Sequence, residues 1–352
     1  MQQTITFPSG TVNYHFLQPE HSDINVVSIV DEQYDMQHAV FITNEHIARL
    51  YPDIFKGRKC LVLPPSEHTK DISTIASQAR ELLKLEATRN TLLIGVGGGV
   101  ITDITGFLAS VYMRGVSFGF IPTSLLGMVD AAIGGKNGVN VGLNKNIIGT
   151  IKQPEFIILD TRFLNSLPAE EWSNGFAEII KCACIFDAPL FEELSRNSCT
   201  FYKTDDEVSI GKVIERCVTW KNKTVQEDES EKGVRKLLNF GHTAAHAIEN
   251  MYELSHGKAV GIGMIIACML SERVLGLDKS ATAKLKELLH LYHLPVKLDI
   301  NPNKAMEILK MDKKRHDETI DYILLERIGK AVIKPLTFPV IENALETYER
   351  SN

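Results

Sequence analysis

Several common features are missing from this sequence of 352 residues, and each absence excludes a class of protein. No apolar run reaches the ~18 residues that a membrane-spanning helix needs. The first ten residues, MQQTITFPSG, lack the basic and then apolar order of a secretory signal. The net charge of −6 provides no excess of positive charge for binding nucleic acid or an anionic membrane. We therefore expect neither a nucleic-acid partner nor a membrane partner.

Disulfide signals are missing as well. The six cysteines are scattered along the chain and form no CxxC pair, so we expect reduced thiols in a cytoplasmic protein. The hydrophobic content of 44% and the charged content of 23% are ordinary for a globular protein. The length suits two domains better than one core.

The two halves of the chain differ in their pattern. In the first half, short apolar runs such as HAVFITN, NTLLIGVGG and VSFGFIPT alternate with helical patterns, which is typical of a parallel sheet covered on both faces. In the second half helical patterns dominate, apart from one candidate hairpin in TIDYILLERIGKAVIKPL. The sequence thus predicts an α/β protein with a Rossmann-like domain over residues 1–163. A mostly helical domain is predicted over residues 164–352.

Three consecutive glycines, Gly97 to Gly99, follow an apolar run and open a helical pattern. Glycines let the backbone approach a ligand closely, and the free N–H groups at a helix start can bind a phosphate. The spacing is neither that of a Walker loop nor a strict GxGxxG, so a tight strand-to-helix turn is the alternative. Because a turn does not need three glycines, we favour phosphate or dinucleotide binding.

A second glycine-rich segment, MVDAAIGGKNGVNVGLNKNIIG, carries Asp130, Lys136, Lys145 and Asn146 among apolar residues. A solvated loop is the simplest interpretation for any one of these side chains. Charged residues in apolar, glycine-rich loops, however, usually contact a ligand or one another. Cationic side chains near a glycine turn suit a phosphorylated substrate.

The segment NFGHTAAHAIEN places His242 and His246 four residues apart on one helix face. Both can be structural, both can bind one metal, or they can divide two functions; the HxxxH spacing alone favours two ligands. His256 and Glu178 are further candidates, since two histidines and a carboxylate form a common catalytic zinc site. Lys181, one turn after Glu178, is either its ion-pair partner or a substrate contact.

Nine segments between about residues 90 and 270 together resemble the 3-dehydroquinate synthase family of sugar-phosphate cyclases. They occur in the order and spacing of that family. The segments are GGGVITD, YMRGVSF, IPTSLL, VDAAIGGKNGVN, NKNIIG, QPEFIILDT, LPAEEWSNGFAEIIK, DESEKGVRKLLNFGHTAAHAIE and HGKAVGIGM.

The resemblance implies a carbon–oxygen lyase of the shikimate pathway, which leads to the aromatic amino acids. The substrate would be 3-deoxy-D-arabino-heptulosonate 7-phosphate, and the products 3-dehydroquinate and phosphate. The route would be transient oxidation by NAD, phosphate elimination, re-reduction and intramolecular aldol closure. The first domain would bind NAD and the second a metal, zinc or cobalt, together with the substrate. The family also implies a homodimer.

The resemblance further implies a role for individual residues. The metal ligands would be Glu178, His242 and His256, so that His246 would handle a proton instead of binding the metal. The catalytic residues would be His246, Glu231, Lys181, Asp130 and Asn239. The substrate contacts would be Arg114, which could reach in from a partner subunit, Asp130, Lys136, Asn146, Lys181, Lys221, Arg235, Leu238, Asn239, His246 and Lys313. The NAD contacts would be Asn44, Glu67, Lys70, Gly98, Gly99, Val100, Asp103, Thr123, Ser124, Lys145, Phe163, Leu164, Asn165 and Ser166.

Two positions depart from the family pattern: Lys258 stands where an acidic residue is usual, and Thr102 where glycine is common. Three alternatives stay open at this point. A related cyclase would take sedoheptulose 7-phosphate or glucose 6-phosphate, a polyol dehydrogenase of the same architecture would accumulate NADH, and a non-catalytic nucleotide-binding protein would release no phosphate.

Overall fold

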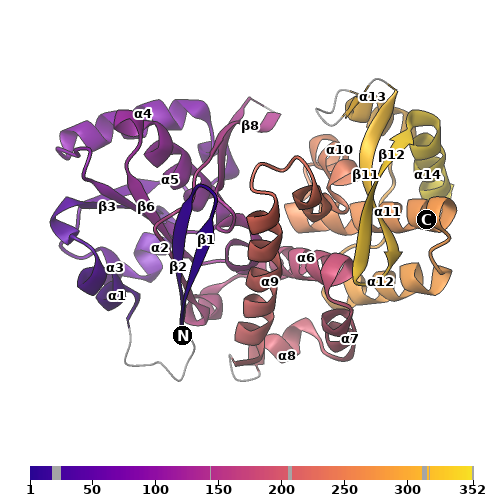
Figure 1. The fold of residues 1–352 in the computed structure, drawn as a ribbon, viewed down its shortest axis with the longest axis horizontal. Coiled ribbons are helices and arrows are strands. Elements are labelled where there is room, and N and C mark those ends of the chain that lie inside the picture. Colours follow the sequence, from indigo (N-terminus) through magenta and orange to yellow (C-terminus); the bar gives the residue numbers. More distant parts are fainter. Residues whose placement is uncertain (18–24, 143, 205–207, 311–314, 317, 351–352) are drawn as a thin grey trace. The chain divides into compact units, whose positions relative to one another are not determined.

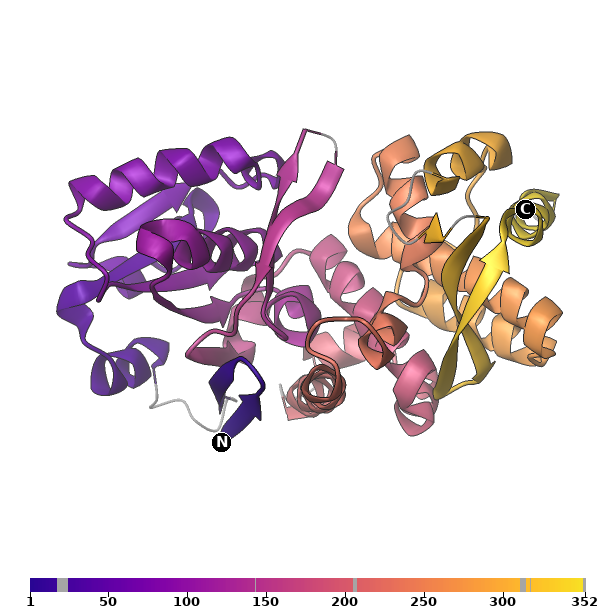
Figure 2. The ribbon, with the colours of Figure 1, turned by 45° about the horizontal axis from the view of Figure 1, so that its top comes forward.

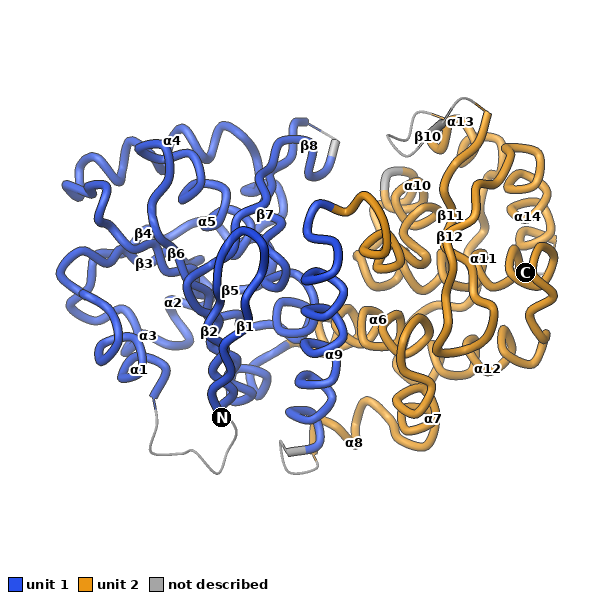
Figure 3. Tube along the Cα trace, viewed as in Figure 1, with its two compact units in different colours: residues 1–167, 206–230 blue, residues 168–205, 231–352 orange. Residues whose placement is uncertain are grey.

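The computed structural model describes residues 1–17, 25–142, 144–204, 208–310, 315–316 and 318–350. The chain forms two compact units (Figure 3). Unit 1 comprises residues 1–167 and 206–230, and unit 2 comprises residues 168–205 and 231–352. None of the helices in the described part of the chain combines the length and apolarity required to cross a bilayer.

Unit 1 is built on a seven-stranded sheet with the order β1-β2-β9-β6-β5-β3-β4 (Figure 1). All neighbouring strands are parallel except β1 and β2, which form an antiparallel hairpin at one edge. The central strands are apolar and buried along their whole length, as expected for a sheet covered on both faces. The strands are β1 (Gln2–Phe7), β2 (Gly10–Leu17), β3 (Ala39–Asn44), β4 (Cys60–Leu63), β5 (Leu92–Gly97), β6 (Ser117–Pro122) and β9 (Phe156–Asp160).

A separate antiparallel hairpin of β7 (Lys136–Val141) and β8 (Asn144–Ile151) also belongs to unit 1 (Figure 2). The helices of unit 1 are α1 (Val26–Gln33), α2 (Glu45–Leu50), α3 (Pro52–Phe55), α4 (Ile72–Lys84), α5 (Gly99–Val111) and α9 (Val208–Glu227). Short helical turns connect them: η2 (Met36–His38), η3 (Glu67–Thr69), η4 (Tyr112–Arg114), η5 (Gly127–Ala131) and η6 (Thr161–Ser166).

Unit 2 is mostly helical, with a three-stranded antiparallel sheet packed on its central helix α11. The helices are α6 (Ala169–Phe186), α7 (Ala188–Arg196), α8 (Cys199–Thr204), η7 (Val234–Asn239), α10 (His242–Tyr252), α11 (His256–Leu275), α12 (Lys279–Leu291), α13 (Pro302–Lys310) and α14 (Phe338–Arg350). The strands are β10 (Arg315–His316), β11 (Thr319–Arg327) and β12 (Lys330–Thr337).

Glycines determine how closely α10 and α11 approach. Gly241, the residue before α10, has φ +79°, a left-handed value that favours glycine. A Cβ atom at Gly263 in α11 would overlap the carbonyl oxygen of Gly241. The two backbones are therefore in direct contact at the point where α10 begins.

The predicted α/β class, the parallel sheet and the mostly helical second half are confirmed, and the candidate hairpin is β11 and β12. The predicted division after residue 163 lies close to the end of the first segment of unit 1 at residue 167, but α9, which the prediction placed in the second domain, groups with unit 1. Asn222 of α9 accepts a hydrogen bond from the Tyr14 hydroxyl, and Gln226 donates to the Thr6 carbonyl. A helical pattern identifies a helix but not the sheet against which it packs.

Candidate metal centre and nucleotide-binding turn

Three side chains in unit 2 form a cluster that suits a metal ion. The cluster consists of Glu178 of α6, His242 at the start of α10 and His256 at the start of α11. Each side chain offers one ligand atom, and these atoms lie within 4.8 Å of one another. The Oε1 atom of Glu178 lies 3.5 Å from His242 Nε2 and 3.0 Å from His256 Nε2. The cluster joins residues from three helices, which explains why sequence spacing alone cannot define it.

Each member of this cluster is held by a second contact that faces away from the shared centre. The Nδ1 atom of His242 donates to the Phe240 carbonyl at 3.2 Å, and Nδ1 of His256 donates to Glu249 Oε1 at 2.9 Å. Lys181 forms an ion pair with the other oxygen of Glu178. Both Nε2 atoms are thereby directed to the same carboxylate oxygen, an arrangement typical of histidine ligands.

The electrostatics of the cluster also suit a cation. Burial acts to raise the pKa of Glu178, but the Lys181 ammonium holds it well below its usual range, so the carboxylate is ionised. Burial and the same ammonium lower the pKa of His242 well below its usual range, so this ring is neutral. Burial opposes protonation of His256, yet hydrogen bonds to Glu178 and Glu249 raise its pKa to about 10. A divalent cation would replace that proton.

His246 lies one turn after His242 on α10, with its ring edge-on to the His242 ring at a centroid distance of 5.9 Å. It is not part of the ligand cluster, which among the described residues contains His256 in its place. This geometry favours the division of roles implied by the family resemblance over the two-ligand interpretation of HxxxH.

Other predicted substrate contacts of unit 2 lie on or before η7, next to α6. Arg235 is 1% exposed, one of the most deeply buried charged side chains in the described part of the chain, and Leu238 is half-buried. The Asn239 amide donates to Glu231 Oε1 at 2.7 Å, and Glu231 has a left-handed φ of +58°. The structure thus joins two residues whose pairing the sequence did not predict.

In unit 1, the predicted glycine turn connects β5 to α5. Gly98 precedes the helix without any side-chain cap, so the first N–H groups of α5 have no capping partner from that residue. Thr123, after β6, donates its backbone N–H to Gly97, and a Cβ at Gly98 would lie 3.2 Å from Ser124 Oγ. The glycine turn therefore lies next to Val100, Thr123 and Ser124. All are at the carboxyl ends of neighbouring parallel strands, where open α/β sheets bind ligands.

Two of the predicted cofactor residues form a buried ion pair beside this turn. Lys70 contacts Asp103, which follows the turn on α5. Burial raises the pKa of Asp103, although the Lys70 ammonium opposes this. Thr102, one of the two departures from the family pattern, is buried, and its hydroxyl donates to the Gly99 carbonyl at 3.0 Å. The extra side chain is thus accommodated within the first turn of α5.

Asn140 joins two predicted parts of the site that are far apart in sequence. Its backbone N–H donates to the Lys70 carbonyl at 2.8 Å, and its amide donates to Glu67 Oε1 at 3.2 Å. Its amide oxygen accepts the backbone N–H of Asn146 at 2.9 Å. The hairpin that carries Lys136, Lys145 and Asn146 is thus tied to the Glu67–Lys70 segment. Sequence reasoning missed Asn140, although it lies within the second glycine-rich segment.

The remaining predicted residues have ordinary structural contacts. Lys221 of α9 donates to the Asp130 carboxylate at 2.5 Å and to the Asp130 carbonyl at 2.7 Å, so these two predicted substrate contacts are partners.

Asn44 caps α2 at the end of β3. The segment Phe163, Leu164, Asn165 and Ser166 forms η6 after β9, and Ser166 is hydrogen-bonded to Tyr51 at 2.6 Å. Arg114 ends η4 with φ +68°. The predicted contact of Lys313 lies outside the described residues.

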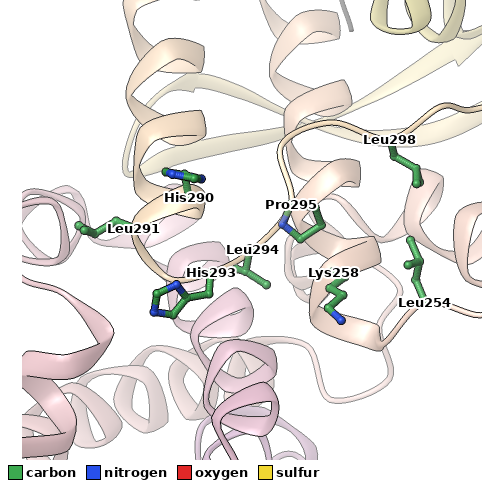
Figure 4. Close-up of a pocket in the computed structure, with 8 residues that line it drawn as sticks. All are labelled: Leu254, Lys258, His290, Leu291, His293, Leu294, Pro295 and Leu298. Atoms are coloured by element: carbon green, nitrogen blue, oxygen red, sulfur yellow. The ribbon is translucent and has the colours of Figure 1, made fainter.

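A cavity of about 620 Å³ within unit 2 is lined by leucines together with Lys258, His290 and His293 (Figure 4). None of its lining residues is a candidate ligand or a predicted substrate contact. Lys258, the second departure from the family pattern, donates to Glu170 at 2.7 Å. We therefore do not place the reaction in this cavity.

The fold is that of the sugar-phosphate cyclases. The structure matches 2-epi-5-epi-valiolone synthase from Streptomyces hygroscopicus, solved with NAD⁺ and Zn²⁺ bound, with a TM-score of 0.82 and 29% identity, covering 90% of this chain and 92% of that one. It matches 2-deoxy-scyllo-inosose synthase with a TM-score of 0.86 and 23% identity, covering 99% and 100% of the two chains. At that lower identity, the second match supports the fold alone.

The sequence comparisons are more specific. The family model for the N-terminal domain of 3-dehydroquinate synthase matches residues 60–174, and the model for its C-terminal domain matches residues 175–315. The chain is 40% identical over 303 residues to the 3-dehydroquinate synthase of Campylobacter concisus, covering 83% of this chain and 86% of that protein. The chain belongs to the 3-dehydroquinate synthase family.

Proposed function

We propose that this protein is a 3-dehydroquinate synthase, a carbon–oxygen lyase that converts 3-deoxy-D-arabino-heptulosonate 7-phosphate to 3-dehydroquinate and phosphate. The observation that carries the proposal is the match of both family domains to a chain in which the ligand cluster is intact. A cytoplasmic location is part of the proposal, supported by the six cysteines, all of which are free thiols.

The proposed cofactors are NAD and one divalent metal ion, zinc or cobalt. The donor set of Glu178, His242 and His256 fits a catalytic metal site, since two histidines and a carboxylate leave a further position for substrate. The glycine turn at Gly98 and Gly99 fits a dinucleotide, because a helix start without a side-chain cap suits its phosphates. When bound, NAD supplies transient oxidation and the metal polarises the reacting oxygen.

The chain's own residues would bind, orient and move protons. In unit 1, the buried pair of Lys70 and Asp103 would shape the nucleotide site beside the glycine turn. In unit 2, the Asn239 amide would orient the Glu231 carboxylate for proton transfer, because it donates to Oε1 at 2.7 Å. His246 would exchange protons with the substrate through its ring nitrogens. Arg235 would pair with the substrate carboxylate, for which its planar fork is suited.

The need for NAD is expected to be catalytic rather than stoichiometric. An oxidation that is reversed after phosphate elimination would leave NAD unchanged at the end of each turnover. With NAD at one hundredth of the substrate concentration, 3-dehydroquinate should exceed NAD many-fold, and no lasting absorbance of NADH should develop. Formation of one NADH per product would contradict the proposal and support a polyol dehydrogenase.

The proposal includes a homodimer. Apolar side chains are exposed along β8 and at the end of the adjoining α5, among them Ile147 at 57%, Val111 at 45% and Ile151 at 43% exposure. Arg114 lies three residues after Val111, in the turn that follows α5. An exposed apolar face of this kind supports an interface between two copies of the chain.

Ile147→Lys is expected to convert the dimer to a monomer, because a charge would be buried in an apolar interface. Light scattering coupled to size-exclusion chromatography measures the mass. Val274→Lys, at a position 39% exposed on α11 of unit 2, is the control and should leave the mass unchanged. An unchanged mass for Ile147→Lys would exclude this face as the interface.

A further inference from the structure

A buried carboxylate, Glu249 of α10, lies behind the ligand cluster. Its side chain is 3% exposed, and its Oε1 atom accepts the Nδ1–H of His256 at 2.9 Å. It contacts the nitrogen on the far side of the ring from Glu178, and it is not part of the ligand cluster among the described residues. Its position suits a role that acts through His256 rather than on the metal directly.

The two histidines of the cluster differ in this outer contact. The ring of His242 donates to a neutral backbone carbonyl at 3.2 Å, whereas the ring of His256 donates to a carboxylate at 2.9 Å. Hydrogen bonds to ionised acceptors are shorter and roughly twice as strong as neutral ones. A carboxylate behind a histidine also increases the basicity of the nitrogen that faces the metal. His256 should therefore be the stronger donor of the two.

The backbone that carries His256 is fixed independently. The N–H of Gly257 donates to Asn174 Oδ1 at 3.2 Å, and a Cβ at Gly257 would overlap the Cα of Asn174. Asn174 lies one turn before Glu178 on α6. The start of α11 is thus held against the helix that supplies the carboxylate ligand, and the freedom that remains to His256 is rotation of its ring.

We propose that Glu249 is a positioning residue that fixes the His256 ring and strengthens it as a donor, so that His256 rather than His242 anchors the metal. This inference rests on the metal site of the proposed function. It concerns metal binding alone, so it can be tested without NAD or substrate.

The test compares Glu249→Leu, which removes the acceptor, with Glu249→Gln, which keeps an acceptor and removes the charge. Glu253→Gln is the matched control, since Glu253 is exposed and directly follows the same helix. Zinc affinity of the metal-free proteins is measured by competition with a chromophoric chelator. The visible spectrum of each protein loaded with Co²⁺ reports the geometry and donor strength around the metal.

Glu249→Leu should weaken zinc binding by about 10–100-fold and change the cobalt spectrum, as for other partners behind metal ligands. Glu249→Gln should show a smaller loss, and Glu253→Gln none. Unchanged zinc affinity and an unchanged cobalt spectrum in Glu249→Leu would overturn the proposal. A loss of zinc affinity in Glu249→Gln as large as that in His256→Ala would also overturn it, because Glu249 would then be a ligand. If Glu249→Leu does not fold, unchanged zinc affinity in Glu249→Gln overturns it.

Assays of 3-dehydroquinate formation are kept separate. A protein that binds zinc as expected but forms no product would count against the proposed function and leave the role of Glu249 intact.

Discussion

His242→Ala and His256→Ala are expected to lose the metal, whereas His246→Ala should keep it and lose turnover. The first two changes remove ligand atoms from a cluster of three, and the remaining two donors hold a divalent cation weakly. A catalytic metal contributes several kcal/mol to transition-state stabilisation. Loss of about 4 kcal/mol corresponds to a rate ~10³-fold lower.

Elemental analysis of the three purified variants decides this prediction. His246→Ala should retain about as much metal as the unmodified protein, because its ring is not part of the cluster. His290→Ala, in the cavity of unit 2 that contains no candidate ligand, serves as a further control and should keep both metal and turnover. Equal metal loss in His246→Ala and His256→Ala would show that the two helix histidines do not divide their functions.

Arg235→Gln is expected to lower kcat/KM for the acid substrate far more than for a neutral substrate. Arg235 is 1% exposed, and a guanidinium in so buried a site is suited to a bidentate pair with the substrate carboxylate. Loss of one partner of such a buried pair costs about 2–5 kcal/mol. Since each ~1.4 kcal/mol is a factor of ten, kcat/KM for the heptulosonate phosphate should fall by at least ~30-fold.

The comparison substrate is sedoheptulose 7-phosphate, which lacks the carboxylate. The unmodified protein should disfavour it by at least ~30-fold for the same reason, and Arg235→Gln should narrow that difference. Lys236→Gln is the matched control, because Lys236 is the next residue of η7 and its ammonium is paired with Asp321 at 2.8 Å. Comparable turnover of both substrates by the unmodified protein would show that the chain is a different cyclase.

Much of the fold follows from the sequence because its signals are local. The apolar run of β5 and the glycines after it predict a buried parallel strand followed by a helix, and both are present. The unit to which α9 belongs was not predictable, since it depends on contacts such as Tyr14 with Asn222, which lie 208 residues apart. A helical pattern carries no information about so distant a partner.

The candidate site shows the same limit. The HxxxH spacing correctly places His242 and His246 on one helix face, but the cluster requires His256 from another helix. The family resemblance implied His256 in place of His246 as a ligand, whereas residue types alone left that choice open. Glu249, Asn140 and the pairing of Lys221 with Asp130 were missed, because each is defined by its contact and not by a motif.

The close crossing of α10 and α11 limits which substitutions the metal site can accept during evolution. Gly263 lies two turns after His256 in α11 and offers no ligand atom, yet even one methyl group there would collide with the carbonyl of Gly241 and displace the residue that follows, His242. Alanine at position 263 would therefore separate His242 from Glu178 without altering any ligand. Substitutions in the apolar interior of α11 are thus constrained by metal geometry, even though that helix interior contributes no atom to the chemistry.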